Sequence, residues 1–273
     1  MRKILVVGHG SRVPEAVAQF YRFVDALSIR VGEPVSSCFL ELVEPDMVAG
    51  LAAAAHDAGK GGEVVVLPLF LGAGGHQKND VVTAIQWARE QFPEITFRYA
   101  APLGPHALLV RLLAQRVEAA LPREADSLAP EVTGVLVVGR GSSDPDSCSE
   151  VARSAYLLFH QRPYLFVDYA FQAAARPGLE EGIRRCQALG AKQVVVAPYL
   201  LFTGKVIEDI RRVTSRVGEQ LGLPVIQAGY LDVHPLIIDV AEQRLHEAMI
   251  DAVSMNCSIC KYREPVGNPV ISA

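Results

Sequence analysis

Two histidines and a glutamate follow three successive apolar runs in the first 80 residues of the chain. His9 comes directly after the first run, Glu41 ends the second, and His76 lies in a glycine-rich stretch after the third. Two imidazoles and a carboxylate can together bind a borderline divalent cation, and they can also accept protons at neutral pH. These residue types therefore predict a site that holds a metal ion and removes protons, provided that the fold brings them together.

Short β-branched runs alternate with longer segments of helical periodicity along the whole chain. The predicted strands are residues 3–8, 35–41, 63–70, 96–101, 132–139, 165–171, 193–200 and 224–230. Strands that are apolar on both faces and separated by helices indicate parallel sheets covered on both sides, so the predicted fold class is α/β. Ligands of such sheets lie beyond the carboxyl ends of the strands, which is where the two histidines and the glutamate fall.

The two halves of the chain repeat each other. The paired segments are residues 8–12 with 139–143, 68–72 with 198–204, and 103–106 with 231–234. Three echoes in the same order, at offsets of 131, 130 and 128 residues, indicate an internal duplication of a four-stranded unit. The predicted organisation is an N-terminal domain at 1–121, a linker at 122–131, a degenerate repeat domain at 132–253 and a tail at 254–273.

The second half keeps the framework of the first but lacks its reactive groups. The replacements are Arg140 for His9, Gln172 for Glu41 and Val206 for His76. Such a pattern suits a duplicated protein that kept one catalytic set and uses its other half as a wall of the cleft. The basic and hydroxyl side chains expected to bind an anionic ligand in this cleft are Ser11, Arg12, Lys78, Arg140, Ser142 and Lys205.

Composition narrows the possible partners and location. The 273 residues carry 26 Lys and Arg against 30 Asp and Glu, and this net negative charge does not favour general binding to nucleic acid. No uncharged apolar segment approaches the roughly 18 residues needed to cross a bilayer, which predicts no membrane partner. Five cysteines, odd in number and mostly scattered, favour a reducing, cytoplasmic location. A dinucleotide fingerprint is excluded because position 13 is Val, and no P-loop is present.

Taken as a set, three motifs of the first half resemble those of the sirohydrochlorin chelatases of the long CbiX and SirB type. They are Gly-His-Gly-Ser-Arg at 8–12, Phe-Leu-Glu-Leu-x-Glu-Pro at 39–45, and residues 68–80 with their Gly-Gly-His-x-Lys-x-Asp end. The degenerate second half is also typical of the long form, so the resemblance covers essentially the whole chain.

This resemblance implies both a fold and an activity. The fold would be two similar α/β domains with the active site in the cleft between them. His9 and His76 would be the catalytic and metal-handling pair, with Glu41 as the assisting carboxylate; which histidine takes the proton is open. The reaction implied is the ATP-independent insertion of Co²⁺ or Fe²⁺ into sirohydrochlorin for cobalamin or siroheme synthesis. Sirohydrochlorin carries eight carboxylates, which agrees with a basic cleft in a net acidic protein.

The tail adds a second motif, Cys257-x-x-Cys260. It resembles an extension of some long cobaltochelatases that is associated with a [4Fe-4S] cluster, and it favours cobalt over iron. A cluster usually needs four thiolates, so a second tail in a homodimer, or Cys38, Cys148 or Cys186, would have to complete it. The alternative is a surface dithiol without a cluster.

Two other functions remain as alternatives. One is a protoporphyrin ferrochelatase, which is disfavoured because that porphyrin has fewer carboxylates. The other is a carrier that binds a tetrapyrrole or a metal in the same cleft without turnover. Both a monomer and a homodimer are compatible with the sequence, because an internal duplication already supplies two lobes.

Overall fold

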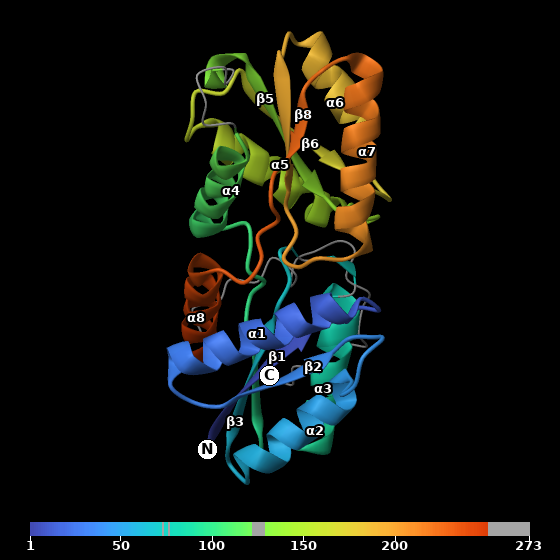
Figure 1. The fold of residues 1–273 in the computed structure, drawn as a ribbon. Helices are drawn as coiled ribbons and strands as arrows, with labels where there is room; N and C mark the ends of the chain where they lie inside the picture. The colour runs from blue at the N-terminus through green and yellow to red at the C-terminus, as the bar shows by residue number, and fades with distance from the viewer. Residues whose placement is uncertain (73, 76, 122–128, 251–273) are drawn as a thin grey trace, which may run out of the picture.

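The computed structural model of the protein describes residues 1–72, 74–75, 77–121 and 129–250. The chain forms two four-stranded parallel sheets, ordered β2-β1-β3-β4 and β6-β5-β7-β8 (Figure 1). The predicted α/β class and the duplication of a four-stranded unit are therefore confirmed.

The elements follow the predicted alternation. The first half contains β1 (Arg2–Gly8), α1 (Pro14–Val31), β2 (Val35–Phe39), α2 (Met47–Ala58), β3 (Glu63–Pro68), a π-helical turn η1 (Gln77–Val81), α3 (Val82–Gln91), β4 (Thr96–Tyr99) and α4 (Ala107–Ala120). The second half contains a 3₁₀ turn η2 (Pro130–Val132), β5 (Thr133–Gly139), α5 (Pro145–Phe159), β6 (Phe166–Phe171), α6 (Leu179–Ala188), β7 (Gln193–Pro198), α7 (Lys205–Leu221), β8 (Val225–Gln227) and α8 (Pro235–Met249).

The two sheets also share their register. Val7 of β1 lies beside Cys38 and Pro68, while Val138 of β5 lies beside Ala170 and Pro198. Every residue of β5 is buried, as is β1 from its third residue on, which is why these central strands read as unbroken apolar runs. The equal register puts the carboxyl ends of β1 and β5 at equivalent places in the two sheets.

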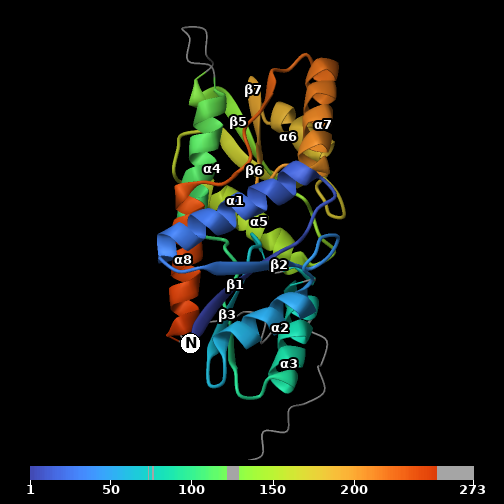
Figure 2. The same ribbon diagram turned by 60° about the horizontal axis from the view of Figure 1, so that its bottom comes forward.

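The last helix of each half packs on the sheet of the other half. Helix α4 packs against β7 and α5, whereas α8 packs against α1, β3 and β4. Two hydrogen bonds join α8 to the first half, from Arg98 Nη1 to the Ala248 carbonyl (3.5 Å) and from Arg244 Nε to the Pro102 carbonyl (2.9 Å). Helices α4 and α8 form one column along the side of the molecule (Figure 2). Below, the N-terminal lobe is the sheet of β1–β4 with its helices, α8 included, and the C-terminal lobe is the sheet of β5–β8 with α4.

Apolar side chains form three clusters around the two sheets. The outer cluster of the N-terminal lobe lies under α2 and α3, and that of the C-terminal lobe under α6 and α7. The third cluster lies between the sheets and joins both halves through Leu27 of α1, Leu113 of α4, Leu158 of α5 and Leu245 of α8. One core therefore holds the two lobes together. Among the helices of the described residues, none is both long and apolar enough to cross a membrane.

The shared core predicts that the two lobes unfold together. Leu113→Ala removes a fully buried side chain from α4, which should lower the free energy of unfolding by about 2–5 kcal/mol. The single tryptophan, Trp87 of α3, reports on the N-terminal lobe. In urea, the midpoints from Trp87 fluorescence and from far-ultraviolet circular dichroism should fall by the same amount. A fluorescence midpoint that stays at the wild-type value would show independent lobes instead.

Candidate active site

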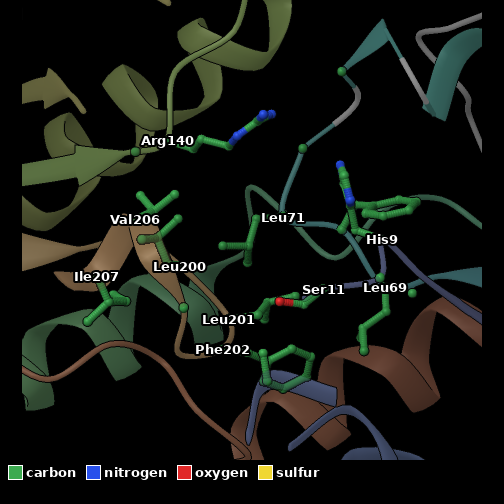
Figure 3. A pocket seen from close by; sticks show the side chains of 18 of the residues that line it. His9, Ser11, Leu69, Leu71, Arg140, Leu200, Leu201, Phe202, Val206 and Ile207 are labelled. Carbon is green, nitrogen blue, oxygen red and sulfur yellow. The ribbon is translucent and has the colours of Figure 1, made fainter. Parts of the chain in front are cut away.

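A cavity of about 840 Å³ lies between the lobes, at the carboxyl ends of β1 and β3 on one side and of β5 and β7 on the other. Its volume is in the upper part of the range of small-molecule sites, roughly 300–1,000 Å³. Much of the wall is apolar; labelled examples in Figure 3 are Leu69, Leu71, Leu200, Leu201, Phe202 and Ile207. A planar organic ligand with a broad apolar surface would suit such walls.

His9 and Glu41 meet at the wall of this cavity. His9 Nδ1 is 3.3 Å from Glu41 Oε1, and the Glu41 amide donates to the His9 carbonyl (3.2 Å). The side chains are 40% and 48% exposed, so the pair contributes only about 0–1 kcal/mol to stability. Its role is orientation: the carboxylate on one side and the edge contact with Phe70 (6.5 Å between ring centroids) on the other hold the imidazole in place.

Gly10 allows this meeting. Its φ is +92°, and a Cβ atom built there would be 1.8 Å from the Glu41 carbonyl oxygen. The second half repeats the arrangement, since Gly141 has φ +90° and a Cβ atom there would be 1.7 Å from the Ala173 carbonyl oxygen. Strand β2 ends at Phe39, so Glu41 lies in the loop after the strand and not at its end as predicted. The close crossing of the loops after β1 and β2 is what places Glu41 beside His9.

His76, the other predicted catalytic residue, lies outside the described residues. Within the part of the chain that the structure describes, no group of three or more His, Cys, Asp or Glu side chains could hold a metal ion. His9 and Glu41 supply two donors, one imidazole and one carboxylate, which is an incomplete set for a tightly held divalent ion. Such a pair could handle a metal in transit.

Five of the six predicted anion-binding residues line the cavity: Ser11, Arg12, Arg140, Ser142 and Lys205. Arg12, Arg140 and Lys205 are exposed, and they form no ion pair with any described residue. His9 and Arg140 extend into the cavity from the two facing lobes (Figure 3). Cations without a carboxylate beside them, on both walls of one cavity, favour an anionic ligand.

The two serines have a structural task as well. Ser11 Oγ accepts a hydrogen bond from the Val13 amide (3.1 Å), and Ser142 Oγ accepts one from the Asp144 amide (3.0 Å). Each serine thereby orders the turn before the first helix of its half. Their hydroxyl hydrogens can still donate to a ligand.

Lys78, the sixth residue, does not line the cavity. Its side chain is 3% exposed, and Nζ lies 2.7 Å from Asp144 Oδ2 and 2.8 Å from Asp146 Oδ2. Two other polar residues that line the cavity, Glu150 and Tyr199, were not expected from the sequence. Complete burial raises the pKa of the Tyr199 hydroxyl, so it stays protonated. The aligned residues of the first half, Gln19 and Leu69, carry no ionisable group, so the repeat gave no signal for either.

Two of the three cysteines among the described residues do not suit a metal cluster. Cys38 is buried in the outer cluster of the N-terminal lobe and Cys186 in that of the C-terminal lobe. Burial raises the pKa of each thiol to about 12, so neither forms the thiolate that iron requires. Cys148 lines the cavity, and burial raises its pKa too. Cys257 and Cys260 lie outside the described residues.

The sequence model of the CbiX family matches residues 3–120 and 134–248, which is most of both halves. The chain belongs to the CbiX family. Among CbiX relatives, the sirohydrochlorin cobaltochelatase of Priestia megaterium is 34% identical over 264 residues, covering 96% of this chain and 85% of that protein. The sirohydrochlorin ferrochelatase of the same organism is 33% identical, covering 86% of this chain and 85% of its own length.

Solved structures agree with the membership of the CbiX family. The structure of SirB from Bacillus subtilis with Fe³⁺ superimposes with a TM-score of 0.79 at 28% identity, over 92% of this chain and 96% of that one. A second SirB structure, in complex with cobalt, gives a TM-score of 0.76 at the same identity and coverage. The predicted chelatase fold is therefore confirmed.

The close crossing at Gly10 leads to a test. Gly10→Ala adds a methyl group that meets a backbone oxygen, so the free energy of unfolding should fall by more than about 3 kcal/mol. Gly32→Ala is the control, because Gly32 has φ +74° but open space around its Cβ position, and it should cost only about 1–2 kcal/mol. Urea unfolding measures both. Equal losses would mean that the loops are not in close contact.

Proposed function

We propose that this protein is a chelatase that inserts Co²⁺ or Fe²⁺ into sirohydrochlorin without nucleotide hydrolysis, as a step toward cobalamin or siroheme. The observation that carries the proposal is the contact of His9 with Glu41, on the wall of a largely apolar cavity that also presents three cations with no ion-pair partner among the described residues. Sirohydrochlorin combines an apolar macrocycle with eight carboxylates. This cavity offers apolar walls for the macrocycle and basic side chains for the carboxylates. The named activities of the relatives support the same reaction.

Insertion has two requirements that fit these residues. Two pyrrole N–H protons must leave, and the nitrogen lone pairs must then bond to a divalent ion that has shed its water. A neutral imidazole can accept a proton or bind the ion, and His9 is positioned for either by Glu41. His76 is proposed as the second imidazole, with the two tasks divided between them. Arg12, Arg140 and Lys205, with Ser11 and Ser142, would bind the carboxylates at the rim.

Cobalt is the proposed metal substrate, and iron the second. Imidazole nitrogens bind Co²⁺ more tightly than Fe²⁺, and the Cys257-x-x-Cys260 tail resembles an extension of some long cobaltochelatases. A single chain supplies both walls of the cavity, so insertion does not require a homodimer. A cytoplasmic location is proposed from the cysteine usage.

Replacing either proposed imidazole should stop turnover. His9→Ala or His76→Ala is expected to lower the rate of metal insertion by about a hundredfold or more. Each variant loses one of the two imidazoles proposed to accept the protons and to bind the metal. The change in absorbance of sirohydrochlorin on metallation follows the reaction at controlled free Co²⁺ or Fe²⁺.

His106→Ala is the control for this series. His106 Nδ1 accepts from the Leu108 amide (3.1 Å) at the start of α4, so its loss should cost about 0.5–2 kcal/mol of stability and leave insertion intact. Equal rates in all three variants would remove the site assignment. Stoichiometric binding without release of metallated product would identify a carrier instead.

We propose further that Cys257 and Cys260 bind a [4Fe-4S] cluster, completed by the same pair from a second chain. Cys38 and Cys186 are excluded as partners by their burial. Protein purified anaerobically should contain iron and acid-labile sulfide. Cys257→Ser should lose both, while Cys186→Ala should retain them. Wild-type protein without either element would leave a simple dithiol.

A further inference from the structure

Lys78 joins the loop after β3 to the first turn of α5 across the boundary between the lobes. Its ammonium group lies 2.7 Å from Asp144 Oδ2 and 2.8 Å from Asp146 Oδ2. The side chains of Lys78 and Asp144 are 3% and 7% exposed, whereas Asp146 is 56% exposed. The lysine comes from the N-terminal lobe and both carboxylates from the C-terminal lobe, so the contact is a bridge between the lobes, buried at its centre.

The anchor of this bridge is itself hydrogen-bonded to the backbone. Asp144 is the N-cap residue of α5: its Oδ1 accepts from the Asp146 amide (3.0 Å), while its Oδ2 contacts the lysine. On the other side, the Lys78 amide donates to the Gly74 carbonyl (3.0 Å) at the start of the π-helical turn. Backbone and ammonium of one residue are thus both held, and the loop is attached to the beginning of a helix.

Helix α5 touches the same loop at a second point. Glu150 lies six residues after Asp144, and its Oε2 would be 1.8 Å from a Cβ atom built on Gly72. A side chain at position 72 would displace this carboxylate, so the absence of one lets Glu150 reach the loop. Gly72 and Lys78 therefore both contact the C-terminal lobe, and position 76 lies between them in the sequence.

The duplicated framework shows that this bridge is specific to one loop. In the repeat alignment Val13 corresponds to Asp144, and Glu208 corresponds to Lys78, so the second half cannot form it. The equivalent loop of the C-terminal lobe is held by a neutral residue, Gln19 of α1, the counterpart of Glu150. Gln19 Oε1 accepts from the Thr203 amide (2.8 Å).

Stability gives no sufficient reason for a buried ammonium. Taking two charges out of water costs several kcal/mol for each ion, and an apolar replacement of a buried ion pair is often neutral or stabilising. The neutral Gln19 contact is an example, in this same protein, of how to join a loop to the opposite lobe without that cost. The Lys78–Asp144 pair fixes the position of the loop after β3, and this loop carries His76, the second proposed catalytic histidine.

We propose that Lys78 is a positioning residue for metal insertion, with Asp144 and Asp146 as its anchors. The bridge holds the loop after β3 against the C-terminal lobe, so that groups on this loop keep a fixed place relative to His9 and the cavity. This role differs from the carboxylate binding that the sequence suggested for Lys78. The inference rests on the proposed function.

The test removes the bridge without leaving a buried charge. Lys78→Met alone leaves Asp144 unneutralised and should lower stability. The double variant Lys78→Met/Asp144→Asn should regain that stability, since Asn caps a helix as well as Asp does. Its kcat for Co²⁺ insertion should nevertheless fall by about tenfold to a hundredfold, the cost of a small misplacement, while KM for sirohydrochlorin changes little. Amide hydrogen exchange at residues 77–82 should become faster.

Gln19→Leu is the control at the other loop. It removes the contact with the Thr203 amide, together with the hydrogen bonds from Gln19 Nε2 to Tyr230 and Asp232, so exchange should quicken at residues 203–205 and not at 77–82, with kcat retained. A double variant with the wild-type kcat, or with unchanged exchange at 77–82, would overturn the positioning role while insertion by the wild type left the proposed function standing. A wild-type protein that inserts no metal would overturn the proposed function itself.

Discussion

The inner face of each sheet is covered by helices of both halves of the chain: α1 and α8 lie on the N-terminal sheet, and α5 and α4 on the C-terminal sheet. The central apolar cluster joins α1, α4, α5 and α8, and it forces the sheets into a fixed relation. Because their strands share one register, that relation turns the carboxyl ends of β1 and β5 toward a common space. The cavity, the meeting of cations from both lobes, and the bridge at Lys78 all depend on this shared core.

On that symmetrical frame the proposed reactive groups belong to one half of the chain. The first half supplies the imidazole and its carboxylate, and the second supplies Arg140, Lys205 and most of the far wall. The two halves also hold each other's loops differently: a neutral amide suffices for the loop after β7, whereas a buried ammonium between two carboxylates holds the loop after β3. Rigid elements thus surround a reaction that needs a proton acceptor, an ion and a large anion in one place.

Local patterns predicted the strands, the duplication and the convergence of His9 with Glu41, because strand period and parallel topology determine which residues reach one sheet edge. The packing of α4 and α8 on the sheet of the opposite half was not predictable, since helical periodicity reveals that a helix has a buried face but not which sheet it packs on. Lys78 was expected in the cavity for a similar reason: a lysine in a loop gives no sign of the direction of its side chain. Its true partners, Asp144 and Asp146, lie 66 and 68 residues away and look like ordinary helix-start residues.

The crossed placement of the terminal helices makes each half depend on the other. The first half alone would leave β3 and β4 without α8, which covers the face opposite to α2 and α3, and its own α4 would lose its contacts with β7. Removing either half would therefore uncover apolar side chains of the other. The C-terminal lobe, which has Arg140 and Gln172 in place of His9 and Glu41, serves the packing of the whole chain as well as the wall of the cavity.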